Sequence, residues 1–125
     1  MKKRMLVMYY TYVLRVEGGM LYTGIAKNMF TRMAQHAAGG KACAKYTRAH
    51  PICALEALWS SEDRASASRL EYALKTLSKA KKEALLRDAR LLHRFLPAIE
   101  KEDYVYHPKA CLALYLKQIP LSRLP

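Results

Sequence analysis

The chain has 125 residues, of which 52% are hydrophobic, so it is long enough to bury the core of one domain. Charged residues interrupt every apolar run well before the roughly 18 residues of a transmembrane span, which argues against a membrane-spanning protein. The formal net charge is +12, and residues 1–50 hold nine Lys or Arg residues against a single acid, so the partner expected from charge is a polyanion such as nucleic acid.

The N-terminal part is predicted to form a β-hairpin. Residues 5–15 are rich in Tyr, Val and Leu and predict a buried strand. Side chains alternate along a strand, so Tyr10 and Tyr12 are expected on the same face. The Glu-Gly-Gly sequence at residues 17–19 predicts the turn, because glycine supplies the positive φ that hairpins need. Residues 20–25 are expected to return as a second, short strand.

A helix is predicted directly after this hairpin. Gly24 indicates a bulge or a close approach to the backbone near the end of the second strand. Asn28 is a predicted N-cap for a helix over residues 29–38. Arg32 and His36 are four residues apart and therefore lie on one helical face. Two tyrosines, an arginine and a histidine are thus expected to converge at one end of the hairpin.

A third strand and a second helix are predicted next. Residues 41–51 form a basic loop whose alternating cations, aromatic ring and hydroxyl suit phosphate contacts. Residues 52–59 predict a strand, and Ser60 with Asp63 predicts a variant capping box that opens a helix. The core face of that helix is expected to consist of Leu70, Ala73, Leu74 and Leu77.

The C-terminal third is predicted with less regular structure. Ser78 is expected to cap a helix over residues 79–95, and Pro97 ends this pattern. The run at residues 111–117 fits either a strand or a short helix, because its periodicity does not decide between them. Residues 98–125 are rich in Tyr and Leu, so they are expected either to add an element to the core or to contact a partner chain.

The three cysteines, Cys43, Cys53 and Cys111, are odd in number and contain no C-x-x-C pair. This pattern predicts neither a disulfide framework nor a cysteine-rich zinc site, and a reduced cytoplasmic setting is the simplest one. Cys53 and Cys111 are expected to be small hydrophobic core residues.

This series of residues resembles the GIY-YIG nuclease superfamily, and more narrowly its small stand-alone bacterial members, often called YhbQ-like. Tyr-Thr-Tyr at residues 10–12 takes the place of the first signature, and Tyr-Thr-Gly at residues 22–24 takes that of the second. Residues 26–28 are also similar to the nuclease subunit of bacterial nucleotide excision repair. The resemblance spans roughly residues 6–86. The later members of the series are Arg32, His36, residues 45–48 and Glu71.

The chain also departs from the family pattern. The glycine and isoleucine of the first signature are absent, and Thr23 replaces the isoleucine of the second. Residues 90–125 lie outside the resemblance. The expected organisation is therefore a GIY-YIG-like domain at residues 1–90 and a C-terminal extension of unknown role at residues 91–125.

The resemblance implies an α+β fold in which helices flank a small, three-stranded, mostly antiparallel sheet. It also implies a DNA endonuclease, with a link to DNA repair, that uses one divalent cation, Mg²⁺ or Mn²⁺. Carried over by position, Tyr12 and Tyr22 would orient or deprotonate the attacking water, and Arg32 would bind the scissile phosphate. Glu71 would hold the metal, and His36 would assist proton transfer. The residues expected to contact nucleic acid are Lys27, Lys41, Lys45, Tyr46, Thr47, Arg48 and Lys75.

The residue types suit this chemistry without the family. A tyrosine with its ordinary pKa near 10 is a poor base at neutral pH, but an arginine and a cation nearby would favour the phenolate. The planar fork of Arg32 binds two phosphate oxygens at once. A single carboxylate such as Glu71 suits magnesium, which keeps most of its waters.

Less specific explanations exist for each residue. Tyrosines in a strand are usually core residues, Glu71 with Lys75 is a common helical ion pair, and a basic surface also keeps a protein in solution. The alternative function is therefore a nucleic-acid-binding module with negligible turnover. The oligomeric state is not predicted, and the C-terminal segment is the expected contact for any partner protein.

Overall fold

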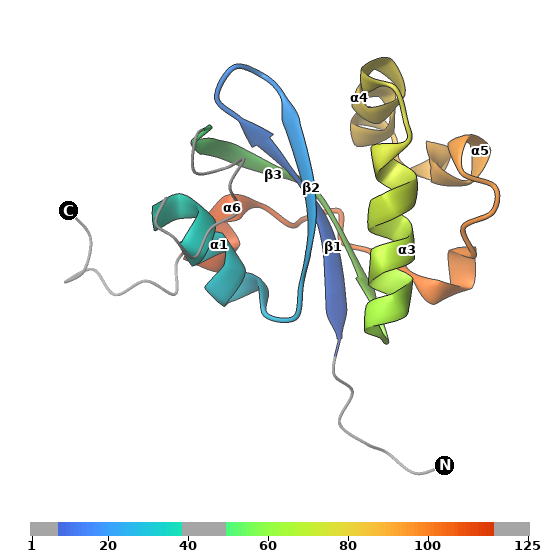
Figure 1. The fold of residues 1–125 in the computed structure, drawn as a ribbon, viewed down its shortest axis with the longest axis horizontal. Coiled ribbons are helices and arrows are strands. Elements are labelled where there is room, and N and C mark those ends of the chain that lie inside the picture. Colours follow the sequence, from blue (N-terminus) through green and yellow to red (C-terminus); the bar gives the residue numbers. More distant parts are fainter. Residues whose placement is uncertain (1–7, 39–49, 117–125) are drawn as a thin grey trace, which may run out of the picture.

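The computed structural model describes residues 8–38 and 50–116. Its strands form one antiparallel sheet in the order β2-β1-β3-β4, with helices on both faces (Figure 1). The expected α+β class is confirmed, and a two-residue strand makes the sheet four-stranded. The strands are β1 (Tyr9–Val16), β2 (Leu21–Ala26), β3 (Ile52–Ser61) and β4 (Val105–Tyr106). The α-helices are α1 (Met29–Ala38), α3 (Arg64–Lys75), α4 (Lys79–Arg87), α5 (Leu92–Phe95) and α6 (Leu112–Leu116).

The predicted hairpin is formed by β1 and β2. Gly18 and Gly19 have φ values of +94° and +85°, so the glycines occupy the backbone region that other residues avoid. Antiparallel pairing places Tyr12 opposite Gly24 and Leu14 opposite Tyr22. Because side chains alternate, the two tyrosines lie on the same face of the sheet.

Each face of the sheet has its own core. On one face, α3 packs its Leu70 and Leu74 against Val13 and Trp59 of the sheet. On the other face, α1 packs Met33 against a cluster from the strands, and α6 lies beside α1. Figure 1 shows α3, α4 and α5 on one side of the sheet and α1 with α6 on the other.

An ion-pair cluster ties the hairpin to α4. The Nε of Arg15 in β1 donates to Glu56 Oε2 in β3 at 2.9 Å, and its two terminal nitrogens donate to Glu83 in α4 at 2.6 and 2.8 Å. The Nζ of Lys79 donates to the carbonyl of Gly19 in the turn at 3.0 Å. The N-terminal end of α4 is therefore held against the hairpin.

The predicted start of α3 was wrong by several residues. Ser60 lies within β3 rather than at the cap, because β1 continues the ladder and pairs Tyr10 with Ser60. Ser60 is buried, and its Oγ is 2.8 Å from the Nε2 of His107. Asp63 is the N-cap instead, and its carboxylate accepts from the backbone N–H of Ser66 at 2.7 Å.

The predicted helix over residues 79–95 is divided in two. Ser78 caps α4 as expected, with its Oγ accepting from the N–H of Lys81 at 3.2 Å. The backbone of Asp88 is extended, with φ at −149°, and its carboxylate accepts from the N–H of Arg90 at 3.1 Å. This local bond competes with the helical pattern and ends α4.

The residues after position 90 add to the packed clusters on both faces of the sheet. Leu92 and Ile99 are buried in the core cluster of α3, and Tyr106 pairs with Trp59 across β3 and β4. The run that fitted either a strand or a helix forms α6. The expectation that this segment adds elements to the core is confirmed, and a contact with a partner chain stays a prediction.

Two expectations drawn from composition, one on the cysteines and one on membrane-spanning segments, can be compared with the structure. Cys53 and Cys111 are exposed, so the prediction that they are core residues was wrong. Each lies near the start of its element, Cys53 in β3 and Cys111 just before α6, where packing is incomplete. Among the described residues, no helix is long and apolar enough to cross a membrane.

Candidate active site

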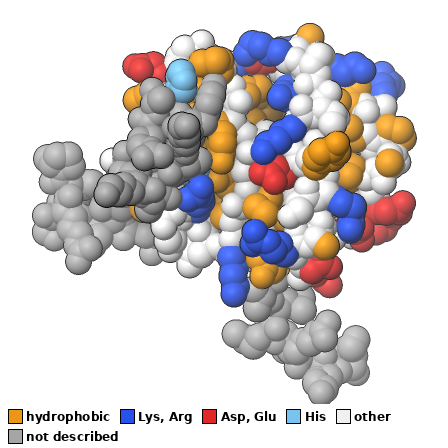
Figure 2. Space-filling view, viewed as in Figure 1, with side chains coloured by type: hydrophobic (Ala, Val, Ile, Leu, Met, Phe, Trp, Pro, Cys, Tyr) orange, Lys and Arg blue, Asp and Glu red, His pale blue; other side chains and the backbone are white. Residues whose placement is uncertain are grey.

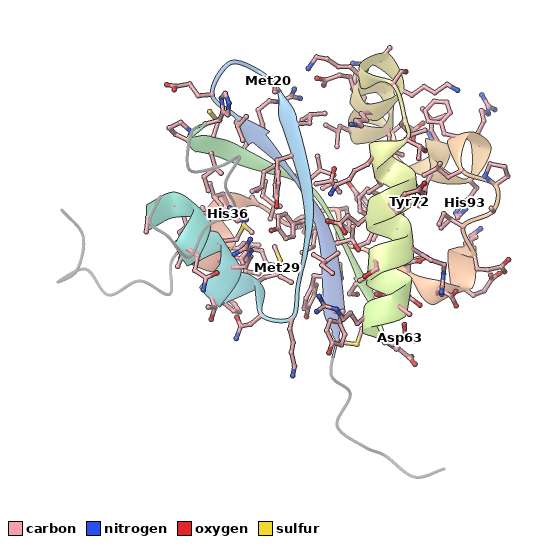
Figure 3. The ribbon with its side chains drawn as sticks, viewed as in Figure 1. Met20, Met29, His36, Asp63, Tyr72 and His93 are labelled. Carbon is pink, nitrogen blue, oxygen red and sulfur yellow. The ribbon has the colours of Figure 1, made fainter. Side chains whose placement is uncertain are left out.

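The predicted convergence of two strands and a helix is present. Tyr12 and Tyr22 project from the face of the hairpin that α1 covers, and Arg32 and His36 come from α1. Asn28 caps this helix as expected, because its Oδ1 accepts from the N–H of Thr31 at 3.0 Å. Figure 3 shows Met29 and His36 on α1 beside the sheet.

The hydroxyl of Tyr12 is the centre of this cluster. It lies 2.8 Å from His36 Nε2 and accepts a hydrogen bond from Arg32 Nε at 3.3 Å. Tyr22, like Tyr12, acts to raise the pKa of Arg32, and Nη1 of Arg32 donates to Gln35 Oε1 at 2.9 Å. The His36 ring meets both tyrosine rings edge-on, with centroid distances of 5.7 and 5.6 Å. We call Tyr12, Tyr22, Arg32 and His36 the tyrosine cluster.

Gly24 makes this geometry sterically possible. A Cβ atom at this position would lie 2.6 Å from the hydroxyl oxygen of Tyr12, 2.8 Å from its Cζ and 3.0 Å from a ring carbon of Tyr22. Real Cβ atoms essentially never come closer than 3.0 Å to such neighbours, so a residue with a Cβ atom would clash here. The Tyr12 side chain therefore crosses the hairpin over a glycine, which has no Cβ atom. The close backbone approach expected at Gly24 is confirmed.

Burial dominates the electrostatics of Tyr12. Its side chain is fully buried, and this desolvation raises the pKa of the phenol to about 12, although Arg32 acts to lower it. Arg32 therefore acts to lower the pKa of Tyr12 as expected, but burial raises this pKa by more. Tyr12 is a neutral phenol at pH 7. For Arg32, burial acts to lower the pKa, but contacts with Tyr12 and Tyr22 raise it above its ordinary value.

His36 is a neutral imidazole. Burial, followed by the charge of Arg32, lowers the pKa of His36 to about 4. The Tyr12 hydroxyl and Nε2 of His36 share a hydrogen bond at 2.8 Å, in which the neutral ring accepts or donates according to its tautomer.

The lowered pKa of His36 predicts a pH dependence of stability. As the pH falls from about 6.5 to about 4, the unfolded chain binds a proton at His36 that the folded protein does not, so the free energy of unfolding decreases. Urea unfolding at several pH values measures this slope, and His36→Gln should reduce it, leaving the part that comes from His107, whose pKa is also lowered by burial. His93→Gln, in α5, is the control that should retain it. Equal slopes for the wild type and His36→Gln would contradict the prediction.

Glu71 reaches the site from α3, on the other side of the hairpin. Its side chain is half-buried, and after burial its charge is among the causes that raise the pKa of Tyr12. Lys75 Nζ donates to Glu71 Oε2 at 3.3 Å, which is the predicted ion pair. The described residues contain no group of three or more His, Cys, Asp or Glu side chains arranged for a metal. A single carboxylate such as Glu71 fits a hard cation such as Mg²⁺, which keeps most of its waters, and does not fit zinc.

Tyr22 is the more accessible tyrosine. It is half-buried and lines an open hollow of about 290 Å³ together with Leu21, Thr23, Lys75 and Lys82. Tyr22 therefore borders this hollow, whereas the fully buried Tyr12 does not line it.

The predicted nucleic-acid contacts are only partly visible. Lys27 is exposed between β2 and α1, and Lys75 is exposed on α3. Lys41, Lys45, Tyr46, Thr47 and Arg48 lie outside the described residues. The sequence interpretation missed Gln35 and Lys82. The i, i+3 spacing from Arg32 was a signal for Gln35, whereas Lys82 is brought to the site only by the packing of α4.

Comparison with known proteins gives consistent similarities. Residues 8–84 match the family model of the GIY-YIG catalytic domain. A UPF0213 protein encoded in the potE 3' region of Serratia liquefaciens is 42% identical over 93 residues, which cover 74% of this chain and 89% of that protein. A UPF0213 protein of Fusobacterium nucleatum is 37% identical over 78 residues, which cover 62% of this chain and 76% of that protein. A UPF0213 protein from Bacillus halodurans, whose structure was solved in solution by NMR, is 38% identical in sequence. The match covers 64% of this chain and 83% of that chain, with a TM-score of 0.42.

Proposed function

This chain belongs to the GIY-YIG family, and we therefore propose that it is a metal-dependent nuclease that hydrolyses phosphodiester bonds in nucleic acid. The observations that support this proposal are the convergence of the tyrosine cluster on the Tyr12 hydroxyl and the action of the Glu71 charge on the pKa of Tyr12. The resemblance to a DNA-repair nuclease makes DNA the proposed substrate, and internal cleavage the proposed reaction.

Phosphodiester hydrolysis needs an oriented water and stabilisation of charge on the phosphate. Tyr22 is proposed to contact the attacking water, because it is the tyrosine that faces the open hollow. Arg32 is proposed to bind the scissile phosphate, since a guanidinium carries five donors in a planar fork that matches two phosphate oxygens. Its hydrogen bond to Tyr12 and the effect of Tyr22 on its pKa support this role.

Tyr12 and His36 are proposed to act one step further from the substrate. The buried phenol accepts from Arg32 Nε and is proposed to donate its own hydrogen to His36 Nε2, which lies 2.8 Å away. A neutral His36 is able to accept that proton if Tyr12 takes one from the Tyr22 side of the cluster. Tyr12 is therefore a positioning residue that also offers a route for the proton.

Glu71 is the proposed ligand of the divalent cation, Mg²⁺ or Mn²⁺. When bound, such an ion supplies Lewis-acid stabilisation of the phosphoryl oxygens and of the leaving oxygen. Glu71 now accepts a hydrogen bond from Lys75, so this lysine is placed to contact phosphate when the carboxylate is engaged elsewhere.

A nucleic-acid-binding module without turnover is the second candidate. It is favoured by the enclosed, neutral Tyr12 and by the single carboxylate of the site among the described residues. The basic charge of the chain supports binding in either case.

The test is a cleavage assay on labelled single-stranded, duplex and branched DNA and on matched RNA, each in Mg²⁺, Mn²⁺ or EDTA. The nuclease proposal expects cleavage with metal and none in EDTA. A Tyr22→Phe variant, purified in parallel, should cut about a hundredfold more slowly, which controls for contaminating nucleases. Binding to these substrates without cutting any of them would favour the second candidate.

A further inference from the structure

The hollow beside Tyr22 continues along the edge of the sheet. A second hollow of about 230 Å³ is lined by Met20, Leu21, Lys79 and Lys82, so the two hollows share Leu21 and Lys82. Together they form a groove that runs from Tyr22 to the tip of the hairpin, between β2 and the helices α3 and α4. Figure 2 shows Lys and Arg side chains spread over this side of the molecule.

Three lysines border this groove, and they differ in their partners. Lys75 is paired with Glu71, and Lys79 is held by Glu83 and by the carbonyl of Gly19. In the described part of the chain, Lys82 has no acid within ion-pair distance. Lys82 lines both hollows, as does Leu21.

The floor of the groove changes character along its length. Next to Tyr22 it is lined by Thr23, Lys75 and Lys82, residue types that suit an anionic oxygen. Toward the hairpin tip it becomes apolar, through Leu21 and through Met20, which is 39% exposed. A nucleic-acid strand has the same alternation, with charged phosphates and apolar sugar and base surfaces.

We propose that this groove binds the nucleic-acid strand next to the cleaved bond, and that Lys82 is the ligand of the phosphate adjacent to the scissile one. The location of the scissile phosphate beside Tyr22 rests on the proposed function. Lys75 supports the same phosphate, and the apolar end of the groove receives the following nucleotide. The strand then runs along the outer edge of β2 toward the turn at Gly18 and Gly19.

The test measures binding separately from cleavage. Fluorescence anisotropy with a labelled single-stranded DNA of about 20 nucleotides, in EDTA and at several salt concentrations, gives the slope of log affinity against log salt. Removal of one phosphate contact lowers this slope by about 0.7 for a single strand and weakens binding for all sequences alike. Lys82→Ala is expected to show both effects, whereas Lys82→Arg should keep the wild-type slope.

Lys81→Ala is the matched control. Lys81 is the neighbouring residue in α4, but its Nζ lies over the ring of Phe95, 5.6 Å from the centroid, and it lines neither hollow. The control should keep the wild-type slope. Equal slopes for Lys82→Ala and Lys81→Ala would overturn the inference, and so would a wild-type protein that does not bind the strand.

A parallel arm in Mg²⁺ separates this inference from the proposed function. If the wild type cleaves and Lys82→Ala keeps the wild-type salt slope, the proposed strand-binding role of the groove is refuted and the proposed nuclease function is supported. No cleavage of any substrate, with a reduced slope for Lys82→Ala, would refute the nuclease and leave the groove as the phosphate site of a binding module.

Discussion

Glu71→Ala is expected to slow cleavage by about a thousandfold while the protein still binds nucleic acid. A bound divalent ion contributes several kcal/mol of charge stabilisation to phosphoryl transfer, and each 1.36 kcal/mol corresponds to a factor of ten in rate. Loss of Glu71, the proposed carboxylate ligand of this ion, should remove most of this contribution. The measurement is the single-turnover rate on the best substrate, in saturating Mg²⁺.

The variant is also expected to fold. Glu71 is half-buried, and its pair with Lys75 is an i, i+4 ion pair, which contributes only about 0.3–0.5 kcal/mol. Glu62→Ala, which removes an exposed acid just before α3, changes the net charge equally and should cut at the wild-type rate. If Glu71→Ala cuts as fast as the wild type, Glu71 has no part in the mechanism.

Gly24→Ala is expected to lower the free energy of unfolding by about 3 kcal/mol or more. The new Cβ would overlap the Tyr12 phenol, which is enclosed by His36, Arg32 and Tyr22 and has no space to retreat. Overpacking a closed site commonly costs about 1–3 kcal/mol, and here the conflict is with two rings rather than with one flexible end. Urea denaturation measures the loss, and the activity should fall as well.

Gly19→Ala provides the comparison for this change. Gly19 has a φ of +85°, but nothing lies within 4 Å of the position of its Cβ. Its replacement should therefore cost only the conformational strain, about 1–2 kcal/mol. If Gly24→Ala is no more destabilising than Gly19→Ala, the packing of Tyr12 over Gly24 does not constrain the hairpin.

The features that were predicted from the sequence depend on local patterns. The Gly-Gly turn, the cap at Asn28 and the spacing of Arg32 and His36 each involve residues within one or two turns of the chain. Strand alternation then placed both tyrosines on the face that α1 covers. The cluster was predictable because a short hairpin followed by a helix leaves few ways to arrange these side chains.

The features that were missed depend on contacts between distant segments. Ser60 was assigned to a cap because its pairing with Tyr10 and its bond to His107 are invisible locally. The raised pKa of Tyr12 required knowledge of how completely the ring is enclosed. Lys82 joins the groove only because Arg15 and Glu83 hold α4 against the hairpin.

The position of β2 at the end of the sheet has a consequence for solubility. In the described part of the chain, β2 pairs only with β1, so its other side offers unpaired backbone groups to any extended chain that approaches. Exposed strand edges of this kind promote aggregation unless charged side chains prevent a second strand from pairing with them. Lys75 and Lys82 stand along this edge, and a second protein strand that tried to add to β2 would bury their ammonium groups. The same two charges that favour a phosphate chain therefore discourage a peptide chain from docking there.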